Sequence, residues 1–486
     1  MVYYTTLMEQ VWRQFVIRSG ILSGAVMLAI ALLFPAIAAA ESGEGAIPVR
    51  INSYENTAAA NGEKALSLQA DEALQKALNS PLKLQRFDGY PAQLADIWRR
   101  ASKEHPTIAL LLSEIAVLQQ KMAPAGGRPD PILSFGTVNH VYDDFFSWKS
   151  PMTRERVAIK QLLERGSKRD ARKAVAEADI VVQVERVAVA RYAIGERLLD
   201  AWFDLAETSV RLKQLDRNRQ LLKALSEVIR TRYELNRAPQ SDLLAAEEKL
   251  AELDSKRTDL EAMLDTLKAR LASSAGLAVS DLPELDVTAM PAPAVVEPTD
   301  WEALFTEVVK EHPESTLYEA IGERIRAQRN VVRLDYRADP TIEAAWSFSP
   351  KHDDFVSLGV SIPLRIHNDE RVDPKMRETY IKEDQVPLMR EELRVRIRSS
   401  VQLEVAKLRG IPDRRRVIEK MTLPLLKQSF DSQLAAYQTG KIPLADILRT
   451  TLDIIDTETS LLLLDVEEAR AALQIDYLTL GLLKRP

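Results

Sequence analysis

Two aspartates, Asp242 and Asp446, occupy the same position in two similar stretches of the chain. The stretches begin at Tyr233 and Tyr437, align at an offset of 204 residues, and share their tyrosine, proline, aspartate and leucine positions. A carboxylate just after a turn stabilises the N-terminus of the following helix. If several chains surrounded an axis, the same carboxylate would form a ring that concentrates cations and resists anions. Both roles stay open, and each tyrosine hydroxyl is placed to donate a hydrogen bond to a carboxylate.

The same stretches predict a turn between two helices. One helix is expected to stop at Asn236 or Gly440, because these residues adopt a left-handed conformation at little cost. The next helix is expected to restart with Pro239 or Pro443 in its first turn, where the missing N–H is no loss. Long amphipathic patterns precede and follow each turn, so the chain is predicted to contain two copies of a long antiparallel helical hairpin.

The duplication extends upstream of these turns. The segment Lys-Glu-His-Pro at 103–106 recurs at 310–313. We interpret each His-Pro pair as a kink where proline interrupts a helix. The alternative, that His105 and His312 bind a ligand, is the weaker interpretation. His140, His352 and His367 are isolated residues without a partner at a metal-ligand spacing, so no metal cluster is expected.

Strands are predicted after the first helical stretch of each copy. In the second copy, residues 342–348 and 356–362 alternate between apolar and small or polar side chains. The pattern is weaker in the first copy, at 132–141 and 154–162. Lipid-facing strands show this period, and so does a half-buried hairpin of a soluble sheet, so the pattern alone leaves both open. The charges at 154–156 are expected to lie outside any bilayer core.

The remaining helices are long. One is predicted from near Ser167 to the turn at Asn236, and about 70 residues would span roughly 100 Å. The return helices carry the 3-4 spacing of coiled-coil seams, with one polar break each. The seam positions are Leu243, Ala246, Leu250, Leu253, Arg257, Leu260, Leu264, Leu267 and Leu271, then Leu448, Leu452, Ile455, Thr459, Leu462, Val466, Ala469 and Leu473. A helix break is expected at Gly410-Ile411-Pro412.

The N-terminus predicts export. Arg13 and Arg18 precede an apolar run at 21–34, followed by small residues, as in a secretory signal peptide over residues 1–40. An uncleaved membrane anchor is the alternative, which Pro35 and the small-residue ending disfavour. The full division is signal peptide 1–40, extended N-terminal segment 41–90, first repeat 91–276, linker 277–299 and second repeat 300–486.

Composition excludes several function classes. A net charge of −6 does not suggest a nucleic-acid binder, and the absence of cysteine removes disulfides and thiolate metal sites. No phosphate-binding loop, nucleophile elbow or His-Glu-x-x-His motif is present, so we expect no enzyme activity, cofactor or metal site. After residue 40 no stretch approaches the ~20 apolar residues of a membrane helix, so any membrane insertion there must use strands closed into a barrel.

The chain resembles the TolC-type outer-membrane factors, the exit ducts of Gram-negative efflux and secretion systems. The resemblance covers about residues 90–480. Besides the duplication and the two turn stretches, it is carried by Leu-Gly-Val-Ser-Ile-Pro-Leu at 358–364 and Thr-Leu-Pro at 422–424. It implies a mainly α fold with a small β part. In that fold each chain of a homotrimer gives four transmembrane strands to a shared β-barrel and its helical hairpins to a periplasmic α-barrel.

The resemblance also implies a function. It indicates an outer-membrane channel of a tripartite efflux system, passive, gated at the periplasmic helix tips, and partnered by a periplasmic adaptor protein and an inner-membrane pump. The layout resembles the heavy-metal-efflux branch more than the secretion branch. The alternatives are a periplasmic adaptor, which normally has one hairpin between β-rich halves, and a helical coiled-coil scaffold.

The same resemblance assigns residues. Asp446 matches an acidic residue of the aperture, Tyr437 a tip residue that holds it shut, and Asp242 its first-repeat counterpart. Arg449 stands where some members carry a second acidic residue, which leaves either a single acidic ring or an Asp446–Arg449 pair. The aperture set is completed by Tyr233. The implied adaptor-docking residues are Asn236, Arg237, Ala238, Pro239, Gly440, Lys441, Ile442 and Pro443.

Overall fold

The computed structural model describes most of the chain beyond the N-terminal region. The described residues are 90–140, 150–236, 238–287, 298, 300–349, 352–439 and 441–483. All of them belong to one compact unit, Lys64–Pro486. The predicted signal peptide, nearly all of the predicted N-terminal segment, about half of the linker (288–297 and 299), Arg237 and Gly440 lie outside the described residues.

The two halves of this unit share one order of two helices, two strands and a helical hairpin, but the first arm of the hairpin is one helix in the first half and is divided into several in the second. The first contains α4 (Ala92–Glu104), α5 (Pro106–Ala125), β1 (Ile132–Val138), β2 (Arg154–Leu162), α6 (Gly166–Glu234) and α7 (Gln240–Ala275). The short 3-10 helix η3 (Val279–Asp281) follows. The second contains α8 (Trp301–Glu311), α9 (Pro313–Leu334), β3 (Thr341–Ser349), β4 (His352–Ser361), α10 (Asn368–Arg371), α11 (Asp373–Val417), the π-helix η4 (Ile418–Thr422), α12 (Leu423–Gln438) and α13 (Leu444–Leu478). The predicted mainly α fold with a small β part is confirmed.

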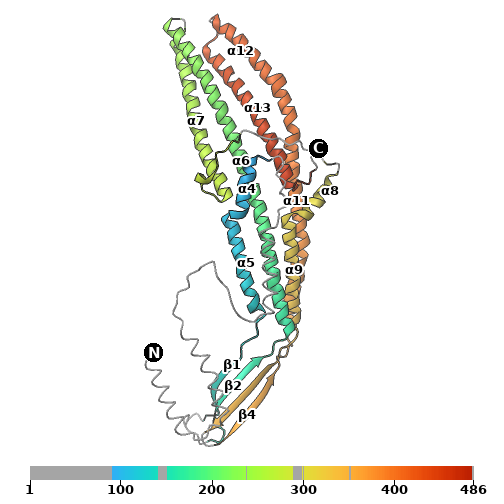
Figure 1. Ribbon diagram of the computed structural model, residues 1–486. Coiled ribbons are helices and arrows are strands. Elements are labelled where there is room, and N and C mark those ends of the chain that lie inside the picture. Colours follow the sequence, from blue (N-terminus) through green and yellow to red (C-terminus); the bar gives the residue numbers. More distant parts are fainter. Residues whose placement is uncertain are drawn as a thin grey trace, which may run out of the picture. The chain divides into compact units, whose positions relative to one another are not determined.

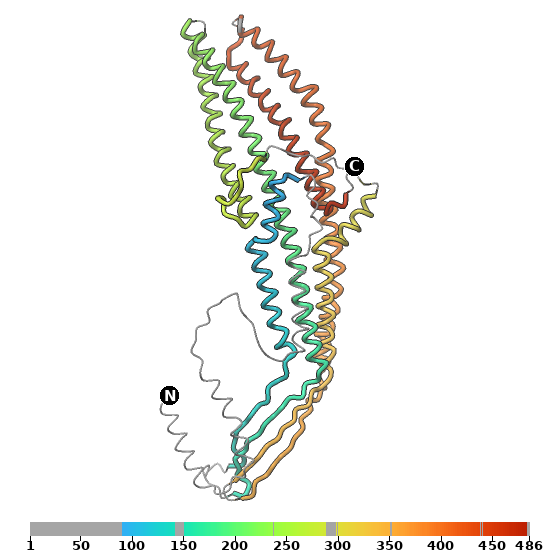
Figure 2. Tube along the Cα trace, in the orientation of Figure 1, coloured from blue at the N-terminus to red at the C-terminus, as the bar shows by residue number. Residues whose placement is uncertain are grey.

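The long helices pair as the seams predict. Helix α6 has 69 residues, about 100 Å at 1.5 Å per residue, and α7 returns beside it as a hairpin (Figure 1). The Cα trace in Figure 2 shows α12 and α13 paired in the same way. At the polar break of the first seam, the Arg257 Nε donates to the Asp216 Oδ1 of α6 at 2.8 Å. Buried seam residues are Ala246, Leu253, Leu267 and Leu271 on α7, and Leu448, Ile455, Val466, Ala469 and Leu473 on α13.

The four strands form one antiparallel sheet in the order β1-β2-β3-β4. The central pair, β2 with β3, joins the two repeats, with Val157 opposite Trp346. The apolar side chains of β4 are uncovered: Val356 is 77% exposed, Leu358 81% and Val360 67%. A half-buried hairpin of a soluble sheet would cover such a row, so the lipid-facing interpretation is the one these exposures favour. Among the described residues, no helix has an apolar stretch sufficient to cross a membrane.

The predicted break at Gly410-Ile411-Pro412 is wrong. Helix α11 continues through Pro412 to Val417, and the irregular turn is the π-helix that follows it. Ile411 is only 1% exposed, so packing holds the helix across one missing hydrogen bond. Pro424, in the first turn of α12, also lacks an N–H to donate, and the wider π turn lies directly before it.

The predicted left-handed residue and the predicted helix restart at proline are both found at the turns, with the prolines one position earlier than expected. Asn236 has φ of 55° and is one of three non-glycine residues with positive φ in the described chain. Pro239 and Pro443 each immediately precede the first residue of the next helix. Each proline is thus at the N-cap, one position before the predicted first turn.

The largest apolar core lies where α4, α5 and α6 meet α7 and α13. Gly195 of α6 is at its centre. The Tyr477 hydroxyl of α13 donates to the Tyr192 carbonyl of α6 at 2.5 Å. The Trp98 indole of α4 also lies against Gly195. A Cβ on Gly195 would come within 3.0 Å of both the Tyr477 hydroxyl and the Trp98 Nε1. Glycine is therefore required here by the close approach of three helices, despite its low helix propensity.

We predict that Gly195→Ala lowers stability, because the added methyl group forces Tyr477 or Trp98 to shift, at a cost of about 1–3 kcal/mol. The matched control is Gly410→Ala in α11, where a Cβ meets nothing within 4 Å and helix propensity alone should raise stability by roughly 0.5–1 kcal/mol. Thermal unfolding followed by circular dichroism measures both. Equal midpoints for the two variants would contradict the packing role of Gly195.

Candidate functional site

The two hairpin tips are held together by a small apolar cluster. We call it the tip cluster, and its buried members come from α6, α7 and α13. They are Leu222, Ile229, Ala246, Leu253, Leu444, Ile447 and Leu448. Because α6 and α7 belong to the first repeat and α13 to the second, the cluster joins the repeats at their turns.

A polar contact spans the same junction. The Tyr437 hydroxyl, at the end of α12, donates a hydrogen bond to the Asp242 Oδ2, in the first turn of α7, at 3.0 Å. Asp242 is only 6% exposed. Burial raises the pKa of Tyr437, the bond to Asp242 raises it further, and nearby Arg232 opposes the shift. Tyr437 therefore stays a hydrogen-bond donor over the ordinary pH range.

The reciprocal pair is not formed within the chain. Tyr233, at the end of α6, is 38% exposed, and Asp446 is half-buried in the first turn of α13. Neither side chain makes a hydrogen bond or ion pair with any described residue. Arg449 is exposed and is not paired with Asp446 in the described part of the chain. The first turns of α7 and α13 are thus alike in sequence and different in their contacts.

The predicted docking residues lie on the two turns. Asn236, Pro239, Lys441 and Pro443 are exposed. Ala238 is half-buried, and Ile442 packs against the tip cluster. Arg237 and Gly440 are outside the described residues.

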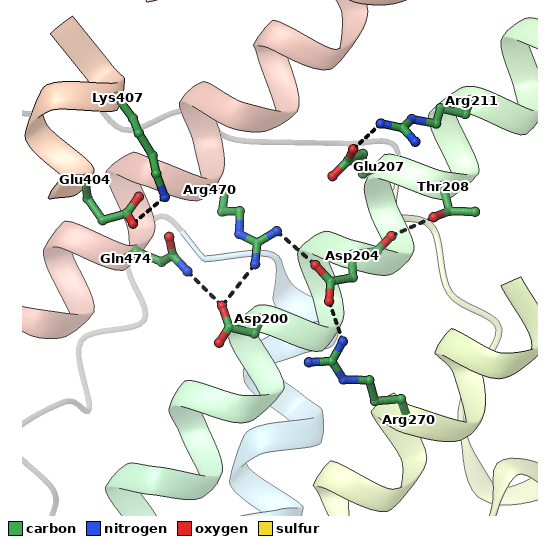
Figure 3. A network of polar contacts seen from close by, with 10 residues as sticks. All are labelled: Asp200, Asp204, Glu207, Thr208, Arg211, Arg270, Glu404, Lys407, Arg470 and Gln474. Carbon is green, nitrogen blue, oxygen red and sulfur yellow. Dashed lines mark hydrogen bonds and ion pairs between the residues drawn. The ribbon is translucent and has the colours of Figure 1, made fainter. Parts of the chain in front are cut away.

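Sequence reasoning missed a second polar junction between the repeats (Figure 3). The Arg470 guanidinium of α13 bonds to Asp204 at 2.9 Å and to Asp200 at 3.2 Å, both on α6. The Gln474 amide donates to Asp200 at 2.8 Å, and Arg270 of α7 donates to Asp204 at 2.7 Å. The available signal was the spacing of the two aspartates, which places both on one face of a helix.

This junction is electrostatically strong because Arg470 is partly shielded from water. Burial alone would lower the pKa of Arg470, but Asp204 and Asp200 outweigh that effect and raise it. Arg470 therefore stays charged and ties α13 to α6 well away from the tips, while Arg270 ties α7 to the same aspartate.

The repeated histidines are helix caps. The Nδ1 of His105 accepts the Thr107 backbone N–H at 3.1 Å, and the Nδ1 of His312 accepts that of Glu314 at 3.2 Å. In each case the following proline is the first helical residue. The kink is therefore a new helix start with its own cap. Within the described ranges, no group of three or more His, Cys, Asp or Glu residues is placed to hold a metal ion.

Similar folds are found among solved structures, although no family model and no curated protein matches the sequence. The outer membrane protein VceC from Vibrio cholerae is 15% identical with a TM-score of 0.58, over 80% of this chain and 96% of that chain. CusC, whose structures concern transmembrane channel formation, is 11% identical with a TM-score of 0.63, over 80% and 92%. The MtrE outer membrane channel of Neisseria gonorrhoeae, in its open state, is 11% identical with a TM-score of 0.58, over 81% and 90%.

The chain has the TolC-type fold. The resemblance drawn from the sequence is thus confirmed at the level of the fold, including the strands that were predicted weakly in the first repeat. The tip cluster and the Tyr437–Asp242 bond join the hairpins of one chain at their turns, and the Arg470 contacts join them farther from the turns.

We predict that His312 makes the stability of the folded chain depend on pH. Burial lowers the pKa of His312 to about 4, with a further lowering by Arg396 and an opposing effect of Glu314. The folded chain therefore keeps His312 neutral while the unfolded chain, with its pKa of about 6.5, takes up a proton as pH falls. Between about pH 7.5 and pH 5 this costs the native state roughly 2 kcal/mol.

His312→Asn tests this, since asparagine can cap the helix but does not titrate. The difference in unfolding free energy between wild type and variant should change by that amount over this pH range. His367→Asn, at an exposed position, is the control and should show no such change. A constant difference for His312→Asn would show that the buried imidazole does not control the pH dependence.

Proposed function

We propose that the protein is an outer-membrane exit channel of a tripartite efflux system, with its helical hairpins extending into the periplasm. The channel is a passive homotrimer that a periplasmic adaptor opens and an inner-membrane pump supplies. This role requires no catalytic group and no cofactor. The adaptor and scaffold alternatives are less favoured, because the fold is shared with channels such as VceC, CusC and MtrE.

The exposed apolar row on β4 is the observation that carries the proposal. Val356, Leu358 and Val360 are between 67% and 81% exposed, a costly arrangement in water and a favourable one in lipid. The strands β1 and β4 are the edges of the sheet, and unpaired strand edges are not tolerated in a bilayer. Joining the edges of several chains into one closed barrel resolves both problems, and three is the number of chains that the sequence resemblance implies.

We propose further that the helix tips form the gate. The bond from Tyr437 to Asp242 and the tip cluster hold the hairpins of one chain together. Outward movement of one hairpin breaks this bond and leaves Asp242 without its donor. Adaptor docking on the two turns, at the exposed residues Asn236, Pro239, Lys441 and Pro443, supplies the compensating contacts. Because the layout of the sequence resembles the heavy-metal-efflux branch, we propose metal cations as the first class of substrate to test.

The direct test of the channel is reconstitution. The protein, extracted in detergent, should migrate as a trimer and should form ion-conducting pores in a planar bilayer. A water-soluble monomer that does not insert would overturn the proposed function.

We predict that Asp446→Ala reduces the cation selectivity of the pore or its block by divalent cations, because a carboxylate at the aperture attracts cations. Single-channel recording in asymmetric salt measures selectivity, and added divalent cations measure block. Asp259→Ala, an exposed position well along α7 from the tip, is the matched control. If Asp446→Ala leaves both properties at the wild-type level, Asp446 does not line the conducting aperture.

We predict that Tyr437→Phe favours the open state, because it leaves the buried Asp242 carboxylate without its donor, at a cost of about 1–3 kcal/mol. The closed-to-open equilibrium should shift roughly 5-fold to 150-fold, seen as a higher open probability of trimers in a bilayer. Tyr380→Phe on α11, where the side chain is 52% exposed, removes a hydroxyl outside the tips and should change nothing. An unaltered open probability in Tyr437→Phe trimers would exclude this bond from the gate.

A further inference from the structure

The offset of 204 residues allows the tip surfaces of the two repeats to be compared position by position. Within the chain, the second repeat presents Tyr437 and Leu448 to the first repeat. Tyr437 bonds to Asp242, and Leu448, in the tip cluster, is only 2% exposed. Three positions therefore define this junction: a tyrosine and a leucine from one repeat and an aspartate from the other.

The equivalent three positions are uncovered. Tyr233 and Leu244, the counterparts of Tyr437 and Leu448, are 38% and 55% exposed. Asp446, the counterpart of Asp242, is half-buried and has no side-chain partner among the described residues. Equivalent side chains on equivalent helices thus lie in two environments, one covered by the neighbouring repeat and one open. An exposed leucine and an exposed tyrosine at these positions are what remains when a repeat lacks its neighbour.

The sheet has the same asymmetry and indicates the missing neighbour. The second strand of the first repeat, β2, pairs with the first strand of the second repeat, β3. The equivalent partner of β4, the second strand of the second repeat, is a β1 strand, and β1 is the opposite free edge of the sheet. A second copy of this chain, with its first repeat beside this second repeat, satisfies the sheet edges and the tip positions together.

We propose that Tyr233 of one chain donates a hydrogen bond to Asp446 of the adjacent chain, with Leu244 packed beside it. This rests on the proposed oligomeric channel. Each chain then contributes two tip contacts of the same chemistry, one internal (Tyr437 to Asp242) and one to its neighbour. The side chain that the sequence resemblance assigned to an acidic aperture ring is, in this arrangement, an acceptor at a subunit junction.

Cross-linking tests the arrangement, because the chain contains no cysteine of its own. A tyrosine–aspartate pair holds its Cβ atoms too far apart for a disulfide, which needs about 3.5–4.5 Å, so a short bis-maleimide is the suitable reagent. The Tyr233→Cys, Asp446→Cys double variant should give covalent multimers on a denaturing gel. The matched control, Tyr437→Cys with Asp242→Cys, should link within one chain and give no multimers.

Co-expression of chains with only Tyr233→Cys and chains with only Asp446→Cys sharpens the test, since any product must then join two chains. Links within single chains, or no links in trimers that conduct normally, would overturn the proposed contact and leave the channel proposal intact. Loss of trimers from the wild type itself would instead count against the proposed function.

A second measurement does not depend on the cysteine variants. Tyr233→Phe should raise the open probability by a similar factor to Tyr437→Phe if the two contacts are equivalent. A wild-type open probability for Tyr233→Phe, alongside a raised value for Tyr437→Phe, would show that the contact between chains is absent from the closed gate.

Discussion

A long two-helix hairpin cannot bury its own apolar faces, and this constraint organises the whole structure. Two helices in contact cover one stripe on each other and leave the remaining sides open. Along α6, the open sides are covered by α4 and α5, by α9 and by α13. The second repeat thus completes the first. The same logic leaves the outer faces of both repeats, and both edges of the sheet, as the surfaces to which further copies of the chain would attach.

Some contacts between the repeats supply most of the stability, and others set how the repeats align. The tip cluster contains six buried aliphatic side chains larger than alanine, each worth about 1.5–3 kcal/mol on burial. The Tyr437–Asp242 bond, by comparison, contributes about 1 kcal/mol net. Apolar burial therefore holds the tips together, while the hydrogen bond sets their register and is the easier contact to exchange. Farther along the hairpins, Arg470 of α13 and Arg270 of α7 both bind Asp204 of α6. These contacts hold the three helices together away from the tips.

Several features of the fold were predictable because they depend on local chemistry. Asn236 takes the left-handed conformation that its type favours, and the 3-4 spacing of leucines correctly predicted which side of α7 and α13 is buried. Alternation located all four strands, although residues 139 and 140 of the first lie beyond the observed end of β1 at Val138. Strand β4 begins at His352, so Asp353 and Asp354, where the sequence indicated a turn, lie within the strand. The expected break at Pro412 failed because local propensity was outweighed by packing around Ile411. The sequence predicted that each His-Pro pair interrupts a helix. Only the structure showed that the histidine Nδ1 caps the helix that follows.

The sequence by itself determined the tandem design of this protein: two hairpins, two turns, two pairs of strands and a matched set of tyrosine, leucine and aspartate at each tip. These follow from periodicity and from residues whose backbone preferences act within a few positions. Only the tertiary structure decided which tyrosine meets which aspartate, and that Asp200 and Asp204 receive an arginine from the far end of the chain. Such pairings depend on how helices 195 to 270 residues apart in the chain pack. Similar local sequences cannot distinguish a covered face from an open one.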